Sequence, residues 1–371
     1  MARLGDICRI NMGQSPDSST YNDHGIGLPF YQGNADFGEV YPSARVYCSS
    51  PVKVAQKGDI LISVRAPIGA LNMANEKCCI GRGLAAITAN EDVCDRQYLW
   101  YVLLSKVEEL NAKGTGSTFK AINRNILDET EIPLIPIDDQ KQISDQLDKV
   151  VSLISQRKKQ LQKLDDLIKS RFVEMFGDYD LSLQKTGWYK VSQIGTVVGG
   201  STPKTNVPEY WNGEYRWISP AELKMDSGVI FDSEKKITKA GIESCSLQEL
   251  PIGTVILSSR APIGKVAIAG NTFYCNQGFK NIICSTKVKP RFLYTLLLYN
   301  TEYLNSLGRG ATFKEISKSI VEEIRIPVPP IKDQERFVQY NDKIDGVRRC
   351  LKQGHDKLEQ MKQALMQKYF E

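Results

Sequence analysis

The stretch Gly58-Asp-Ile-Leu-Ile-Ser-Val-Arg-Ala-Pro-Ile-Gly-Ala70 occurs a second time in the chain, as Gly253-Thr-Val-Ile-Leu-Ser-Ser-Arg-Ala-Pro-Ile-Gly-Lys265. Seven of the thirteen positions are identical, whereas random pairing at average composition gives roughly one. A repeat at a long, fixed offset indicates that the chain is built from repeated structural units. We therefore expect two copies of one folding unit.

The repeat covers most of the chain. An offset of 195 residues aligns Gly83 with Gly278, and an offset of 194 aligns the Gly-x-Gly-x-Thr-Phe-Lys segments 114–120 and 308–314. Near the start of each copy only a weak match remains, at an offset of 187, and the sequences diverge between it and the repeated stretches. Duplication followed by local divergence explains this pattern.

Each copy combines a globular part with a helical one. Short apolar runs such as Ile60 to Val64, punctuated by Gly and Pro, predict strands and turns. Residues 98–110 and 291–304 have the apolar spacing of helices. We therefore expect α/β domains of mixed α+β structure over 1–137 and 179–331.

A long helix is expected after each domain, over 138–178 and 332–371. Asp139 and Gln142 have the spacing of an N-terminal capping box, so the first helix is predicted to start there. Apolar residues then recur every seven positions, which is typical of a coiled-coil seam. The seam comprises Leu147, Ile154, Leu161 and Ile168 in the first helix and Phe337, Ile344, Leu351 and Leu358 in the second, with Val347 and Met361 beside it.

The heptads do not show which helix each long helix packs against, because heptads alone fix neither partner nor orientation. Equal helix lengths within one chain favour an intramolecular pair, and homodimerisation is the alternative. The second helix departs from the first at Gly354 and His355, where Leu161 has no apolar counterpart.

Composition narrows the class of protein. The 371 residues are 42% hydrophobic and 25% charged, with a net charge of +5 and no apolar signal segment at the start, so we expect a soluble, cytoplasmic protein of two or three domains. The nine cysteines form no C-x-x-C pair, which argues against disulfides and zinc. Mild basicity permits nucleic-acid binding but does not argue for it alone.

Catalytic motifs are missing from the sequence. The two histidines, His24 and His355, occupy unlike positions of the repeat, so they predict neither a histidine-based triad nor a metal site. Neither a phosphate-binding P-loop nor a dinucleotide fingerprint occurs. We therefore expect no catalysis and no cofactor in this chain.

The order domain, helix, domain, helix, with Arg-Ala-Pro-Ile-Gly in both domains, resembles the specificity subunit of type I restriction-modification systems. The resemblance also rests on the Gly-x-Gly-x-Thr-Phe-Lys segments, on Ile-Pro-x-x-Pro before each helix and on Leu164 to Gly177. It implies two target recognition domains that each read one half of a bipartite DNA site, separated by two antiparallel spacer helices.

The resemblance also implies partners. Two DNA-methyltransferase subunits would dock on the chain, and an endonuclease subunit would complete the restriction enzyme. The cofactors S-adenosylmethionine, ATP and Mg would then belong to those partners. The alternative from another class is a scaffold that carries two protein-binding domains on a coiled-coil rod.

The duplication itself sorts the candidate DNA contacts, because residues shared by both domains cannot distinguish two different half-sites. Shared cations are therefore candidates for phosphate contacts, although an arginine beside the Pro-Ile-Gly turn could instead bond local carbonyls. The shared pairs are Arg65 with Arg260, Lys120 with Lys314, and Arg124 with Lys318.

Base readout is expected where the copies diverge, since Asn and Gln suit adenine edges and Lys suits guanine. Taken singly, each such residue could equally be a solvated loop residue, and Trp211 could pack its loop or touch a sugar. The candidates are Gln14, Asp17, Asn22, Gln32 and Asn34 in the first copy and Lys204, Asn206, Asn212, Glu222 and Lys224 in the second.

Overall fold

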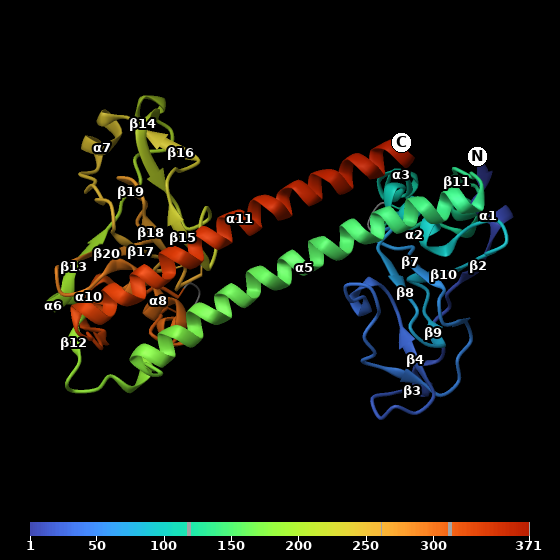
Figure 1. The fold of residues 1–371 in the computed structure, drawn as a ribbon, viewed down its shortest axis with the longest axis horizontal. Helices are drawn as coiled ribbons and strands as arrows, with labels where there is room; N and C mark the ends of the chain where they lie inside the picture. The colour runs from blue at the N-terminus through green and yellow to red at the C-terminus, as the bar shows by residue number, and fades with distance from the viewer. Residues whose placement is uncertain (117–119, 261, 311–313, 371) are drawn as a thin grey trace. The chain divides into compact units, whose positions relative to one another are not determined.

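A computed structural model describes residues 1–116, 120–260, 262–310 and 314–370. The Ser-Thr-Phe and Ala-Thr-Phe portions of the repeated glycine-rich segments, at 117–119 and 311–313, therefore lie outside the described residues. The chain divides into two units, Met1–Lys159 with Leu351–Glu371, and Gln160–Cys350. Each unit holds one globular domain and segments of two long helices, α5 (Ile137–Phe176) and α11 (Ile331–Phe370) (Figure 1).

The first domain mixes short strands and helices. Its elements are β1 (Ala2–Arg3), α1 (Leu4–Ile7), β2 (Cys8–Met12), β3 (Tyr21–Asn22), β4 (Leu28–Tyr31), β5 (Tyr47–Cys48), β6 (Val54–Ala55), β7 (Ile60–Ser63), β8 (Leu71–Met73), β9 (Cys78–Ile80), β10 (Leu84–Ala89), α2 (Arg96–Ser105), α3 (Val107–Lys113), α4 (Arg124–Asp128) and β11 (Glu131–Ile132). Short 3-10 helices span Ser18–Thr20 and Asn34–Asp36.

The second domain repeats this order at its two ends. Its elements are β12 (Tyr189–Lys190), α6 (Val191–Ile194), β13 (Gly195–Gly199), β14 (Trp211–Ile218), β15 (Asp226–Ile230), β16 (Lys235–Ile237), α7 (Lys239–Ser244), β17 (Val255–Leu257), β18 (Val266–Ala269), β19 (Tyr274–Cys275), β20 (Lys280–Cys284), α8 (Pro290–Tyr299), α9 (Thr301–Ser306), α10 (Lys318–Glu323) and β21 (Arg325–Ile326). Short 3-10 helices span Leu181–Leu183 and Pro208–Tyr210. The order differs between β13 and β17, where a helix, α7, is present.

The central sheets of the two domains have the same topology. The order β2-β10-β7-β8 in the first domain corresponds to β13-β20-β17-β18 in the second, where β15 adds a parallel strand at the edge. A further sheet in each domain contains one parallel pair, β4 with β9 and β14 with β19. The predicted duplication of mixed α+β domains is confirmed.

Strand pairing extends the repeat into the region where the sequences diverge. Phe30 pairs with Cys79 in the first domain, and Trp217 pairs with Tyr274 in the second. Cys79 and Tyr274 are related by the offset of 195, so Phe30 corresponds to Trp217 at the offset of 187. The weak match near the start of each copy therefore continues through β4 and β14.

The alternating side chains of the central strands build two cores. In β7, Ile60 and Ile62 pack in the cluster that contains α2, whereas Leu61 packs in a second cluster on the other face. All three side chains are fully buried, and each such burial contributes about 1.5 to 3 kcal/mol. This two-sided burial explains the continuous apolar run in the sequence.

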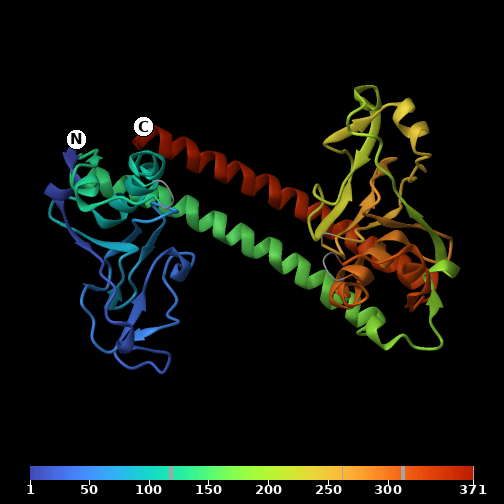
Figure 2. The same ribbon diagram turned by 180° about the vertical axis from the view of Figure 1, so that it is seen from behind.

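The two long helices pair within each unit, as Figure 2 also shows from behind. In the first unit, Leu147 near the start of α5 shares a cluster with Phe370 at the end of α11. In the second unit, Phe172 and Phe176 near the end of α5 pack on Phe337 near the start of α11, with ring centroids 5.4 and 5.5 Å apart. The helix segments are therefore antiparallel, and the predicted intramolecular pairing is confirmed.

The predicted start of the first helix is wrong. The helix begins at Ile137, two residues before the expected cap, and Asp139 lies within its first turn. The buried side chain of Gln140 anchors this turn to the domain: its amide nitrogen donates to the carbonyls of Val93 (3.0 Å) and Ile135 (2.8 Å), and its oxygen accepts from the Asp95 N–H at 2.8 Å.

Gln334 makes the same three bonds in the second unit, to Lys287 (3.1 Å), Pro329 (2.8 Å) and the N–H of Lys289 (2.8 Å). The glutamine of the repeated Asp-Gln pair is therefore an anchor between the long helix and the domain.

The predicted seam residues differ in how deeply they are buried between the helices. Leu147, Ile154, Ile168 and Phe337 are buried, whereas Leu161, Ile344, Leu351 and Leu358 are half-buried. Val347 and Met361 are 49% and 52% exposed, so their assignment beside the seam is wrong. Two helices cover only a narrow stripe of each other, and these residues lie outside it.

The helix α11 continues without a break through Gly354 and His355. Within the part of the chain that the structure describes, no helix is both long and apolar enough to span a membrane.

Candidate nucleic-acid interface

The described residues of the Arg-Ala-Pro-Ile-Gly turn are held by the same serine bonds in both domains. The Ser63 hydroxyl donates to the Pro67 carbonyl at 2.6 Å and accepts from the Ala70 N–H at 2.9 Å. Ser258, its counterpart, makes both bonds in the second domain at 2.7 and 2.8 Å. Gly69 has a φ of +87°, a left-handed conformation that favours glycine. These shared residues fix the loop that carries each arginine.

Backbone bonds tie the same turn to two other loops. In the first domain the Val64 N–H donates to the Gly83 carbonyl, and the Ile122 N–H donates to the Val64 carbonyl, both at 2.9 Å. Ser259 repeats both bonds in the second domain at 2.8 and 3.0 Å. The end of the glycine-rich segment therefore lies beside the arginine, and Arg65 forms a β-bridge with Ala121.

A shallow cleft of about 380 Å³ lies beside this turn in the first domain. Four loops contribute to it, so residues far apart in the sequence meet here. Its polar side chains come from Ser15, Tyr21, Gln32, Asn34, Arg65 and Arg82. The cleft thus combines two cations with two amides, the groups that bind phosphates and read base edges.

Both arginines of this cleft are exposed. Among the described residues, neither the Arg65 nor the Arg82 guanidinium has a carboxylate within ion-pair distance or a hydrogen-bonded carbonyl. In the part of the chain that the structure describes, the Arg65 side chain therefore does not make the local carbonyl bonds that the alternative interpretation expects. Its guanidinium is available to an incoming phosphate.

The corresponding arginine of the second domain has acidic and basic neighbours. The Arg260 Nη1 lies 3.7 Å from the Glu315 Oε2, and the Lys280 Nζ lies 3.2 Å from the Glu315 Oε1. Lys280 also donates to the Ser259 hydroxyl at 3.3 Å, and that hydroxyl donates to Glu315 at 3.4 Å. We call these four residues the Glu315 network.

The other shared cations lie on the surface. Lys120 and Lys314 are exposed at the ends of the glycine-rich segments. Arg124 and Lys318 begin the short helices α4 and α10, where each pairs with an acid four residues on, at 3.1 Å and 3.7 Å. Such exposed pairs are weak and can exchange for a phosphate. All four remain predicted phosphate contacts.

The base-readout candidates of the first domain fall into two groups. Gln32 and Asn34 line the cleft, and Gln14 is exposed on the loop that follows β2. Asp17 instead caps a 3-10 helix by accepting from the Ser19 N–H at 2.9 Å, a bond that lowers the pKa of its carboxyl group.

Asn22 closes its own loop, since its side chain donates to the Ile26 carbonyl at 2.8 Å and accepts from the Ile26 N–H at 2.9 Å. Asp17 and Asn22 therefore shape the loops on which the cleft depends, and their polar atoms are largely occupied.

The second-domain candidates are more scattered. Lys204 and Asn206 are exposed on the segment that leads into β14, and Asn212 is exposed within that strand. Trp211, the first residue of β14, packs the preceding segment by donating to the Lys204 carbonyl at 3.2 Å. Lys224 is exposed after the same strand.

Glu222 has a structural role, because its carboxylate accepts from the N–H groups of Ser219 (2.9 Å) and Glu234 (2.8 Å). Asp36 does the same in the first domain, accepting from the Gln32 N–H at 2.8 Å.

Sequence reasoning missed Arg82, Lys280 and Glu315. Their counterparts at the repeat offsets are Gln277, Ala85 and Ala121. All three positions therefore differ between the copies, as expected of residues that make the two domains specific for different sequences. The search for divergence was confined to the segments before the repeated stretches, whereas these residues lie after them.

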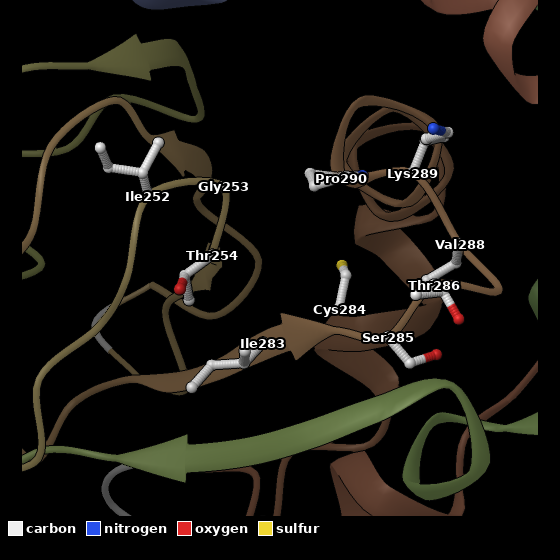
Figure 3. A pocket seen from close by; sticks show the side chains of 10 residues that line it. All are labelled: Ile252, Gly253, Thr254, Ile283, Cys284, Ser285, Thr286, Val288, Lys289 and Pro290. Carbon is white, nitrogen blue, oxygen red and sulfur yellow. The ribbon is translucent and has the colours of Figure 1, made fainter.

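A second cavity, of about 270 Å³, lies at the opposite end of β17 and β20 from Arg260 (Figure 3). Its walls include Gly253, Cys284 and Pro290. In the first domain the counterpart of Pro290 is Arg96, whose guanidinium covers Gly58 at this position. Replacement of a long side chain by proline therefore accounts for the space.

Two similar domains, each with an arginine turn supported by the same bonds and each joined to long helices that pair, define a duplicated two-domain protein. The family model of the type I restriction modification DNA specificity domain matches residues 1–165 and 186–360. The chain belongs to this family.

Individual relatives agree with this assignment. The type I restriction enzyme MjaIX specificity subunit of Methanocaldococcus jannaschii is 36% identical over 209 residues, which cover 55% of this chain and 48% of that protein. The chain thus matches about half the length of this curated relative. The MjaVIII specificity subunit of the same organism is 22% identical over 389 residues, covering 99% of this chain and 90% of that protein.

The fold also has a solved counterpart. The S subunit of a type I restriction-modification system from M. genitalium aligns with a TM-score of 0.61 and 15% identity, covering 100% of this chain and 95% of that one. The agreement extends over both domains and both helices.

Proposed function

We propose that this chain is the DNA-recognition subunit of a type I restriction-modification complex and binds a bipartite duplex target. The observation that carries the proposal is the arginine turn, which occurs twice with the same supporting bonds but with different side chains around it. Shared cations would contact phosphates in both half-sites, and the surrounding loops would read different bases. The segment between the half-sites would remain unread.

The partners follow from the same proposal. Two methyltransferase subunits would bind the chain, and an endonuclease subunit would complete the restriction enzyme. S-adenosylmethionine, ATP and Mg would be held by those partners, and this chain would contribute recognition without catalysis. The 40-residue helices α5 and α11, each about 60 Å long at 1.5 Å per residue, would act as spacers between the domains.

Genome-wide mapping of methylated adenines in cells with and without this chain tests the proposal. Loss of methylation at one motif with two defined halves and an indifferent gap is the expected result. Unchanged methylation would refute it and favour a protein scaffold. Restoration by the intact chain, and not by a variant with both Arg65→Ala and Arg260→Ala, would connect the activity to the arginine turns.

A further inference from the structure

We infer that Glu315 makes the second domain bind DNA differently from the first, by restraining Arg260 and Lys280 and reducing their contribution to phosphate binding. The inference rests on the proposed function, because it assumes that both arginine turns face a duplex. It assigns a specificity-determining role to a carboxylate that belongs to no shared motif.

The frame around the two arginines is the same, so the difference lies in side chains. Three positions that contact the turn change together between the copies. They are Val64 and Ser259, Ala85 and Lys280, and Ala121 and Glu315, in the first and second domain respectively. Among the described residues, the apolar trio of the first domain leaves Arg65 without a paired carboxylate, whereas three polar residues of the second join Arg260 in the Glu315 network.

The charges of the two sites differ accordingly. The lining of the first cleft contains Arg65 and Arg82 and no carboxylate. In the second domain Gln277 stands where the first has Arg82, and the carboxylate of Glu315 lies between Arg260 and Lys280. The Lys280 side chain is only 13% exposed, whereas those of Arg260 and Glu315 are 36% and 38% exposed.

The restraint matters for binding more than for stability. Partly exposed ion pairs contribute little to the free energy of folding, so the network adds little stability. A carboxylate beside the cations repels an incoming phosphate, and each phosphate contact that is lost reduces the slope of log K against log salt by about 0.9. The second domain should therefore bind with less salt dependence and rely more on base contacts.

The test measures salt dependence of duplex binding by the full chain. Fluorescence anisotropy with a random-sequence duplex of about 30 base pairs, between about 50 and 200 mM KCl, gives the slope for each variant. Glu315→Gln keeps the shape of the side chain and its backbone bridge but removes the charge. Ala121→Glu introduces the same carboxylate in the first domain.

Glu335→Gln is the matched control, since it removes one negative charge from an ion pair with Lys289 in the same unit, 2.8 Å apart. Thermal unfolding of every variant checks that the fold is intact.

We expect Glu315→Gln to steepen the slope by about one to two and to tighten binding by about threefold to tenfold. Ala121→Glu should reduce the slope by about one, and Glu335→Gln should leave it near the wild-type value. Equal slopes for Glu315→Gln and Glu335→Gln, with wild-type binding intact, would overturn the inference alone. Failure of the wild-type chain to bind any duplex would overturn the proposed function together with the inference.

Discussion

Among the described residues, the turn arginine of the first domain lies in a cleft without an ion-pair partner, whereas the equivalent arginine of the second domain lies beside a carboxylate. The bonds that support Arg65 and Arg260 among the described residues are the same, from the serine that fixes the turn to the backbone bonds that hold it. Everything that sets their charge environment differs. Duplication has thus kept the support of the site and changed its chemistry, as two unlike half-sites require.

The largest expected difference between the copies concerns folding. Phe172 contacts the rings of Phe176, Phe292 and Phe337 and is almost fully buried, whereas its counterpart in the repeat, Met366, is half-buried. Phe172→Ala should lower the free energy of unfolding by about 3 to 5 kcal/mol, and Met366→Ala by less. Chemical denaturation measures both, and equal losses would show that the two helix junctions are equivalent.

The anchoring glutamines should behave alike in the two copies. Gln140→Ala and Gln334→Ala would each leave two partly buried carbonyls and one N–H without their side-chain partner, at a cost of about 1 to 3 kcal/mol. Thermal unfolding of the two variants should show similar shifts. A loss in only one variant would contradict the shared role assigned to this residue.

The arginines of the first cleft should dominate electrostatic binding. Replacing both Arg65 and Arg82 by Ala should weaken duplex binding about tenfold and reduce the salt slope by about two, because two unpaired phosphate contacts are lost. Arg260→Ala should change the slope by less than about one, because Glu315 already compensates this charge. A salt titration that ranks these variants in the opposite order would contradict the charge comparison.

The shared lysines should have the most uniform effect across duplexes. Lys120→Ala together with Lys314→Ala should weaken binding to every duplex by a similar factor and reduce the salt slope by about two. Anisotropy with several unrelated duplexes measures this. An unchanged slope would count against phosphate contacts at these positions.

Sequence alone predicted the parts of the molecule that both copies share. Identity around Arg65 and Arg260 located the turn, and the heptads located the helix pair. The start of α5 was missed because Asp139 and Gln142 have the spacing of a local cap, whereas Gln140 acts through contacts with Val93 and Asp95, about 45 residues earlier. Such a tertiary role has no local signature.

The candidate site was predicted less completely. Gln32, Asn34 and Arg65 meet in one cleft as expected of DNA-contacting residues, but Arg82 and Glu315 come from loops that sequence spacing does not bring together. The correspondence between Phe30 and Trp217 also needed strand pairing, since the two segments share no sequence motif. The two copies have lost detectable sequence similarity in these segments, so the repeat is recognised there only from the structure.

The central claim is that each domain reads its own half-site through the loops around its arginine turn. Mapping methylated adenines in cells that carry Gln32→Ala with Asn34→Ala tests it most directly. The account predicts relaxed sequence preference in one half of the bipartite motif, with the other half and the gap unchanged. Equal relaxation of both halves, or an unaltered motif, would contradict it.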